Sequence, residues 1–168
     1  MSRTDGNTVH LSVRELVEFV LNSGDIDNRR TGPAVMDAMS MGAAVHRLIQ
    51  KSQDDSYTPE VAFRIMMDLQ GAMLEVSGRA DGIIEGMGDD GRPHYTVDEI
   101  KGVYRDIQKM DQPVPVHLAQ AICYAYILAV EKGLNTVGVR MTHVQLEEED
   151  AGKKKQQAIP AIRYFHNE

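Results

Sequence analysis

The chain has 168 residues, of which 18 are lysine or arginine and 25 are aspartate or glutamate, so its formal net charge is −7. A chain of this length fits one domain with a sizeable core, and its acidity argues against a protein that coats nucleic acid with its whole surface. No apolar run approaches the roughly 18 residues of a membrane span, and no leader segment is evident, so we expect a cytoplasmic protein without a membrane partner. The single cysteine, Cys123, excludes an internal disulfide and a four-cysteine zinc or iron–sulfur site within this chain.

The first part of the chain predicts two helices. Residues 1–11 are polar and are expected to be flexible, while residues 12–168 form a single domain. Ser12 and Glu15 have the spacing of a capping box, which predicts a helix of about three turns that Gly24 can end. After a loop over residues 25–33, an apolar stripe predicts a second helix from about Val35 to Lys51.

The middle of the chain predicts three antiparallel strands. After a loop at residues 54–59, residues 61–67 alternate as a strand, Gln70 and Gly71 form a turn, and a second strand runs from Met73 to about Ile84. A turn cluster at residues 86–93 precedes a third strand from Tyr95 to Lys101. If this hairpin folds about Asp90, Asp81 lies roughly opposite Glu99.

The last part of the chain predicts one long helix and two strands. The connection over residues 102–115 contains a possible helical turn at 104–107, and its prolines exclude regular helix at its end. A helix then runs from His117 to Lys132 and ends before Gly133. A strand at residues 137–146, a solvated acidic turn at 147–157 and an edge strand at 159–165 complete the fold. The order predicts an α/β protein of the α+β type, with a mixed central sheet of about five strands flanked by helices.

Polar residues occur at places where these elements can converge. On the strand Val97–Gly102, Glu99 and Lys101 point to one face, and Asp98 and Ile100 point to the other. Glu99 is preferred to Asp98 as the functional acid, because only Glu99 shares a face with Lys101. The simpler interpretation is a solvated surface ion pair of little energetic value.

Two helices carry further candidates. His46 follows Gly42 by four residues, although a single histidine is more often an ordinary helix residue than a ligand. Gln120 and Tyr124 are spaced four residues apart and therefore share a helix face. Tyr124 is alternatively a core tyrosine, because its neighbours are apolar.

Taken together, these residues resemble the motifs of the PD-(D/E)xK nuclease superfamily, in its RecB-like exonuclease branch. The matches span about residues 12–146 and follow the family's order: Gly42 to His46 as Gly-x-x-x-His, Gly78 to Asp81 as Gly-x-x-Asp, Glu99 to Lys101 as acid-x-Lys, and Gln120 to Tyr124 as Gln-x-x-x-Tyr. The resemblance implies a restriction-endonuclease-like core. Ala80 stands where the family's proline precedes the acid, which is usual for this branch.

The resemblance also implies a Mg²⁺ or Mn²⁺ site and a nuclease reaction. Asp81, Glu99, the backbone carbonyl of Ile100 and His46 would bind the metal, and the histidine favours Mn²⁺. Asp81, Glu99 and Lys101 would be catalytic, with Lys101 orienting the attacking water. Gln120 and Tyr124 would hold the substrate strand. The iron–sulfur cluster of several relatives is excluded by the lone cysteine.

The expected function is a metal-dependent deoxyribonuclease, in particular an exonuclease, acting on single-stranded DNA or on free ends. Some relatives are fused to helicases, and this chain has no phosphate-binding loop of its own, so a helicase partner in DNA repair, recombination or mobile-element processing is one expectation and a homo-oligomer another. Two alternatives stay open. One is a non-catalytic module that keeps the fold and binds nucleic acid or protein, and the other is a structural domain in which Asp81, Glu99 and Lys101 form an ion-pair network.

Overall fold

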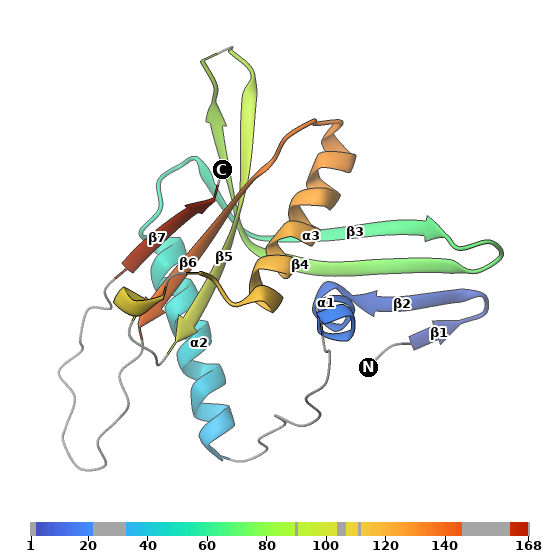
Figure 1. The fold of residues 1–168 in the computed structure, drawn as a ribbon, viewed down its shortest axis with the longest axis horizontal. Helices are drawn as coiled ribbons and strands as arrows, with labels where there is room; N and C mark the ends of the chain where they lie inside the picture. Colours follow the sequence, from blue (N-terminus) through green and yellow to red (C-terminus); the bar gives the residue numbers. More distant parts are fainter. Residues whose placement is uncertain are drawn as a thin grey trace.

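A computed structural model describes residues 3–21, 33–89, 91–103, 107–110, 112–145 and 162–167 of the chain. It contains one mixed sheet flanked by helices (Figure 1). The elements are β1 (Arg3–Asp5), β2 (Thr8–Ser12), α1 (Val13–Leu21), α2 (Pro33–Lys51), β3 (Tyr57–Asp68), β4 (Met73–Met87), β5 (Pro93–Val103), the 3₁₀ turn η1 (Ile107–Lys109), α3 (Pro115–Lys132), β6 (Gly138–Gln145) and β7 (Ile162–Asn167). The expected α+β class is confirmed.

The sheet follows the order β1-β2-β4-β5-β6-β7, and β3 pairs with β4. Strands β2 and β4 are parallel, as are β5 and β6, and the other pairs are antiparallel. The strands β1 and β2 add an N-terminal pair to the five strands that we expected. The sheet is mixed because two of its connections return the chain in the direction of the strand before them. One connection runs through α1, α2 and β3, and the other runs through α3.

Strand β4 changes its partner along its length. Its first residues, 73–77, pair with β2, and its residues 82–87 pair with β5. Strand β3 accompanies β4 from Met73 to Ile84, across both parts. The segment 78–81, which carries the Gly-x-x-Asp motif, thus lies where β4 leaves β2 and reaches β5.

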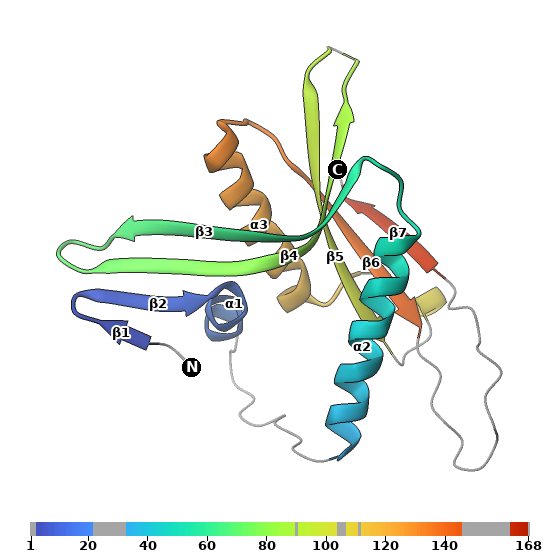
Figure 2. The same ribbon diagram turned by 180° about the vertical axis from the view of Figure 1, so that it is seen from behind.

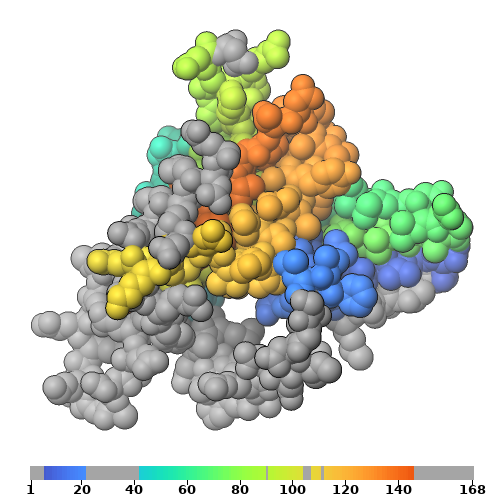
Figure 3. All heavy atoms as spheres, viewed as in Figure 1, coloured from blue at the N-terminus to red at the C-terminus, as the bar shows by residue number. Residues whose placement is uncertain are grey.

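The helices cover opposite faces of the sheet. In Figure 1 α3 lies in front of the sheet, and in Figure 2, seen from behind, α2 lies in front. The main core packs α1 and α3 against the sheet and includes Val13, Phe63, Ala80, Val97 and Leu128. A smaller core packs α2 against β5 and β6 through Val45, Ile49, Ile100 and Val144. Figure 3 shows α1 beside α3 on the first face.

The N-terminus differs from our expectation of a flexible segment at residues 1–11. Strand β2 lies parallel to β4, with Val9 opposite Leu74, and β1 folds back on it through a turn at Gly6, whose φ is +59°. The polar composition concealed an alternation over residues 8–12 that is typical of a strand. The capping box that follows is confirmed, since Ser12 Oγ accepts from the Glu15 amide at 3.1 Å and Glu15 Oε2 accepts from the Ser12 amide at 3.0 Å. Gly24 lies outside the described residues.

The predicted hairpins and the long helix are present with shifted ends. Gln70 and Gly71, both with positive φ, form the tight turn between β3 and β4, closed by a hydrogen bond from the Leu69 amide to the Ala72 carbonyl. Strand β3 begins at Tyr57, inside the expected loop, because the Tyr57 ring is buried against Gly82. Helix α3 ends as predicted at Gly133, which adopts the left-handed conformation.

Several expected segments fall wholly or partly outside the described residues, among them the loop at 25–33, the helical turn at 104–107 and the acidic turn at 147–157. The described part of that helical turn is Ile107, where the 3₁₀ helix η1 begins. The edge strand is present as β7 and pairs antiparallel with β6, and residues 159–161 of the expected strand lie outside the described residues. None of the described helices is long and apolar enough to span a membrane.

Candidate metal and active site

Asp81 lies on β4 between two neighbouring strands, β3 on one side and β5 on the other. Pro59 pairs with Gly82 and Val61 with Ala80, so the register places Glu60 opposite Asp81 on one side. On the other side Gly82 pairs with Asp98, and one further step in the same register places Asp81 opposite Glu99. The hairpin about Asp90 therefore has the register that we predicted. Two neighbouring strands bring carboxylates toward Asp81.

Both oxygens of the Asp81 side chain have partners. Oδ1 lies 3.1 Å from Nδ1 of His46 on α2, and Oδ2 accepts a hydrogen bond of 2.7 Å from the Ile100 amide. The hydrogen bond to Asp81 and the charge of that carboxylate raise the pKa of His46 above 6.5, although burial opposes them. A metal that used His46 as a ligand would have to displace a proton there, so its affinity should rise with pH.

Glu99 and Lys101 form a tight pair on β5. Lys101 Nζ lies 2.6 Å from Glu99 Oε1, and the glutamate side chain is 1% exposed while that of the lysine is 22% exposed. The other Glu99 oxygen, Oε2, has no hydrogen-bond partner among the described residues. Burial raises the pKa of Glu99 to about 7, against the attraction of Lys101 and with the repulsion of Asp81. The two carboxylates, which lie opposite each other in the register, are thus close enough for their charges to interact.

Asp98, the other candidate acid of this strand, has a different environment. It is fully buried and accepts hydrogen bonds from Arg140 at 2.8 and 2.9 Å, from Thr142 at 2.7 Å and from the Tyr57 hydroxyl at 3.1 Å. These contacts occupy both of its oxygens. Asp98 is therefore held in a structural network, and the strand leaves Glu99 as its acid beside Lys101.

The Gly-x-x-Asp and Gln-x-x-x-Tyr motifs meet each other. The Tyr124 hydroxyl accepts a hydrogen bond of 3.2 Å from the Arg79 amide, and a Cβ on Gly78 would lie 2.5 Å from that hydroxyl. Gln120 hydrogen-bonds to the same hydroxyl. Glycine is thus required at 78 because Tyr124 approaches the backbone there.

Tyr124 does not line an open groove. It is 3% exposed and packs on Phe63, with ring centroids 5.9 Å apart. A buried ring cannot stack on a base, so our assignment of Tyr124 as a direct substrate-binding residue is corrected to the core position that the sequence left open. Its hydroxyl instead fixes the backbone two residues before Asp81. Gln120 is partly exposed, and its role toward substrate stays a prediction.

The expected metal ligands are only partly gathered. Ligand atoms of His46, Asp81 and the unexpected Glu60 all lie within 4.8 Å of one another. Glu99 faces Lys101 beside this group, and the Ile100 backbone contacts Asp81 through its amide, whereas we expected its carbonyl to face the metal. Glu60 has a φ of +56°, uncommon for a residue other than glycine, and such conformations concentrate at functional sites.

Two further residues, Glu60 and His117, were not predicted from the sequence. Glu60 could have been found, because a hairpin that turns at Gln70 and Gly71 places residue 60 opposite residue 81. His117 precedes Gln120 by three residues and so shares its helix face. Its Nδ1 atom is buried without a hydrogen-bond partner among the described residues.

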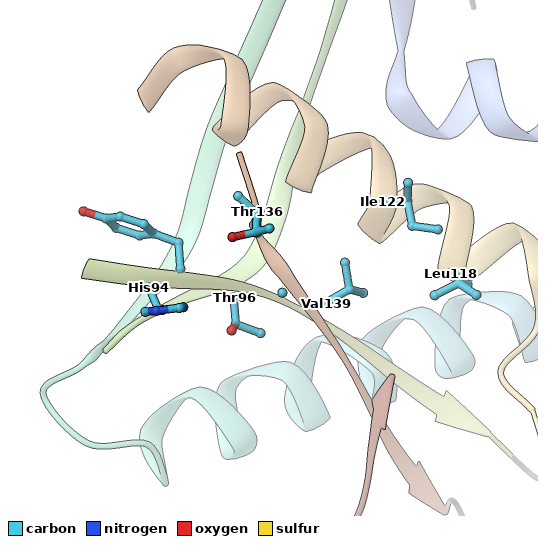
Figure 4. Close-up of a pocket in the computed structure, with 9 residues that line it drawn as sticks. His94, Thr96, Leu118, Ile122, Thr136 and Val139 are labelled. Carbon is cyan, nitrogen blue, oxygen red and sulfur yellow. The ribbon is translucent and has the colours of Figure 1, made fainter. Parts of the chain in front are cut away.

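A hollow lies elsewhere, between α3 and the starts of β5 and β6 (Figure 4). Thr96, Leu118, Ile122 and Val139 are among the residues that line it, and none of its nine lining residues is acidic. It is therefore separate in chemistry from the carboxylate site.

Comparison with known proteins gives a likeness of fold. No family model matches the chain, and no curated protein matches its sequence. Among solved structures, it is similar to one described as the crystal structure of SSO0001, with a TM-score of 0.52 and 16% identity over 98% of this chain and 69% of that chain. At this level of identity the similarity concerns the fold alone.

Proposed function

We propose that this chain is a metal-dependent deoxyribonuclease, an exonuclease that hydrolyses DNA phosphodiester bonds. The observation that carries the proposal is the buried Glu99 carboxylate, whose Oε1 lies 2.6 Å from Lys101 Nζ, whose Oε2 has no hydrogen-bond partner among the described residues, and whose pKa is affected by Asp81. A carboxylate with a purely structural role is normally satisfied by donors, as Asp98 is. A buried carboxylate that lacks part of its hydrogen bonds is typical of a group that binds a ligand.

The side chains present suit a divalent metal ion. Asp81, Glu99 and Glu60 offer carboxylate oxygens, and His46 offers one imidazole nitrogen. Such a set suits Mg²⁺ or Mn²⁺, and the histidine favours Mn²⁺. When bound, the ion would acidify a water molecule and stabilise negative charge on the phosphate.

The protein's own residues would orient the water, contact the phosphate and hold the metal ligands in place. Lys101 stays partly exposed at the site, so its ammonium can reach a phosphate oxygen and orient the attacking water. Asp81 is held by Ile100 and His46 in a fixed orientation. Tyr124 and Gly78 lock the strand that carries Asp81 against α3.

We propose single-stranded DNA or DNA with free ends as the substrate, delivered by a partner such as a helicase. The net charge of −7 repels phosphate at long range. Two arginines on β3 and β4 are also engaged by acids, Arg79 with Glu60 at 3.0 Å and Arg64 with Glu75 at 3.7 Å. Weak intrinsic affinity follows, and a tether or a motor that raises local DNA concentration would compensate for it.

Digestion of end-labelled DNA tests the proposal. The wild-type chain should degrade a single-stranded oligonucleotide with Mn²⁺ or Mg²⁺ and not with EDTA, and activity should fall as salt rises from 50 to 200 mM, as expected for phosphate contacts. Asp81→Ala should be inactive, while Asp68→Ala, an exposed aspartate at the far end of the β3–β4 hairpin, serves as the matched control. The same assay with duplex DNA and with RNA then distinguishes which nucleic acid is the substrate. No metal-dependent cleavage of any of them would favour the non-catalytic module, which the acidic charge already suits.

A further inference from the structure

His117 lies in the first turn of α3 and carries a buried nitrogen without a partner. Its Nδ1 atom has no hydrogen bond among the described residues, although the imidazole as a whole is only partly buried. An unsatisfied polar atom costs free energy and calls for an explanation in a native structure. The Oε2 atom of Glu99 is in the same condition.

Helix α3 packs on the face of β5 that carries Glu99 and Lys101, since Val97, two residues before Glu99, lies in one core cluster with Ala121 and Tyr124. His117, Gln120 and Tyr124 follow one another at spacings of three and four residues, so they form one face of α3. Tyr124 ties this face to β4 through the Arg79 amide. Helix α3 also packs on β5 and β6, where Lys101 lies opposite His143 in the parallel register.

The charges around His117 keep its imidazole neutral. Burial, the ammonium of Lys101, His143 and Arg14 together lower the pKa of His117 to about 4. Among these charges, that of Lys101 has the largest effect. A neutral imidazole protonated on Nε2 presents a lone pair at Nδ1, and an ammonium group is the natural donor for such a lone pair.

Lys101 would require a second hydrogen-bond acceptor when a metal ion binds at Glu99. Its Nζ atom now lies 2.6 Å from Glu99 Oε1, which is one of the carboxylate oxygens that a metal ion would require. A divalent ion at Glu99 would compete with the ammonium for that oxygen and repel it. The lysine would then lose its partner unless another acceptor stood nearby.

We propose that His117 is a positioning residue, whose Nδ1 accepts a hydrogen bond from Lys101 when a divalent ion engages Glu99. The lysine thus exchanges one acceptor for another and stays at the site, directed toward the substrate phosphate. This inference rests on the proposed function, because it assumes the metal site. With this contact the buried Nδ1 atom of His117 gains a hydrogen-bond donor, and α3 is linked to the acid-x-Lys motif of β5.

Metal affinity, measured by calorimetry with Mn²⁺ on the full chain, tests the inference separately from cleavage. His117→Leu removes the acceptor, so Lys101 should remain on Glu99 and weaken Mn²⁺ binding about tenfold. His117→Gln supplies a carbonyl oxygen and should restore most of the affinity. In a Lys101→Ala background, neither substitution should matter, since there is then no ammonium to relocate. Urea unfolding in EDTA confirms that each variant is folded.

A second measurement uses the wild-type chain and does not depend on the stability of any variant. The ¹⁵N resonance of His117 Nδ1, followed by NMR, should move upfield when Mg²⁺ is added, as expected for a lone pair that accepts a hydrogen bond. Three results would overturn the inference: a resonance unmoved by saturating Mg²⁺, wild-type Mn²⁺ affinity in His117→Leu, or an equal loss with and without Lys101. A wild-type chain that binds no ion would instead remove the proposed function itself, and this inference with it.

Discussion

The buried carboxylate of Glu99 should make the metal-free protein less stable at neutral pH than at mildly acidic pH. Its pKa in the folded state is about 7, against a usual value of 4.5. Below pH 4.5 both folded and unfolded states hold the proton, so the group costs nothing. As pH rises from 4.5 to about 7, the unfolded chain is ionised while the folded chain keeps its proton, and stability is lost. The difference corresponds to about 3 kcal/mol above pH 7, as an upper value.

Glu99→Gln isolates this effect because it keeps the shape of the side chain and cannot ionise. In EDTA at pH 8, we expect the variant to be more stable than the wild type by as much as about 3 kcal/mol, and at pH 4.5 we expect the two to be equal within a few tenths. The pKa of His46 is also raised, and its stabilising contribution is likewise lost as pH rises. Because His46 is present in both proteins, its contribution largely cancels in the comparison.

The assay is urea denaturation followed by circular dichroism at pH 4.5, 6 and 8, each in EDTA. Glu18→Gln is the control, since Glu18 forms an exposed i, i+4 pair with Arg14 and should change stability by less than about 0.5 kcal/mol at every pH. Equal effects of Glu99→Gln at pH 4.5 and pH 8 would refute the reasoning. So would a variant that is less stable than the wild type at pH 8.

Three further substitutions test other parts of the site. Lys101→Ala should keep Mn²⁺ binding and lower single-turnover cleavage by about a hundredfold or more, and a fully active variant would remove Lys101 from the mechanism. Asp98→Ala should lower the free energy of unfolding by about 3–5 kcal/mol, because it leaves the largely buried Arg140 without its carboxylate, and a loss below about 1 kcal/mol in urea would contradict the network. Tyr124→Phe should fold and lose about 1–3 kcal/mol, since the Arg79 amide loses its acceptor, and unchanged stability in the same assay would count against that bond.

The sequence predicted those parts of the fold that depend on local patterns. The turn residues Gln70 and Gly71, the capping box at Ser12 and the stop at Gly133 each act through their own backbone, so their effect can be read without tertiary contacts. The register of the β4–β5 hairpin followed from its turn for the same reason, and it placed Asp81 opposite Glu99.

The remaining features depend on contacts between distant segments. Strand β2 is stabilised by β4, more than 60 residues away, and its own composition is polar. Burial of Tyr124 depends on Gly78 and Phe63, which a helix pattern does not reveal. His117 also escaped notice, because its importance comes from Lys101 on another element, and spacing along α3 alone marks it only as a neighbour of Gln120.

Calorimetric titration of Mn²⁺ into the wild-type chain and into Asp81→Ala tests the metal site most directly. Asp81 contacts both His46 and Ile100 and lies opposite Glu60 and Glu99, so the other proposed ligands are arranged around it. We expect the wild type to bind Mn²⁺ with release of protons, more tightly at pH 8 than at pH 6, and Asp81→Ala to show no binding heat. A wild-type chain that shows no binding at millimolar Mn²⁺, or an Asp81→Ala variant that binds as well as the wild type, would contradict the account.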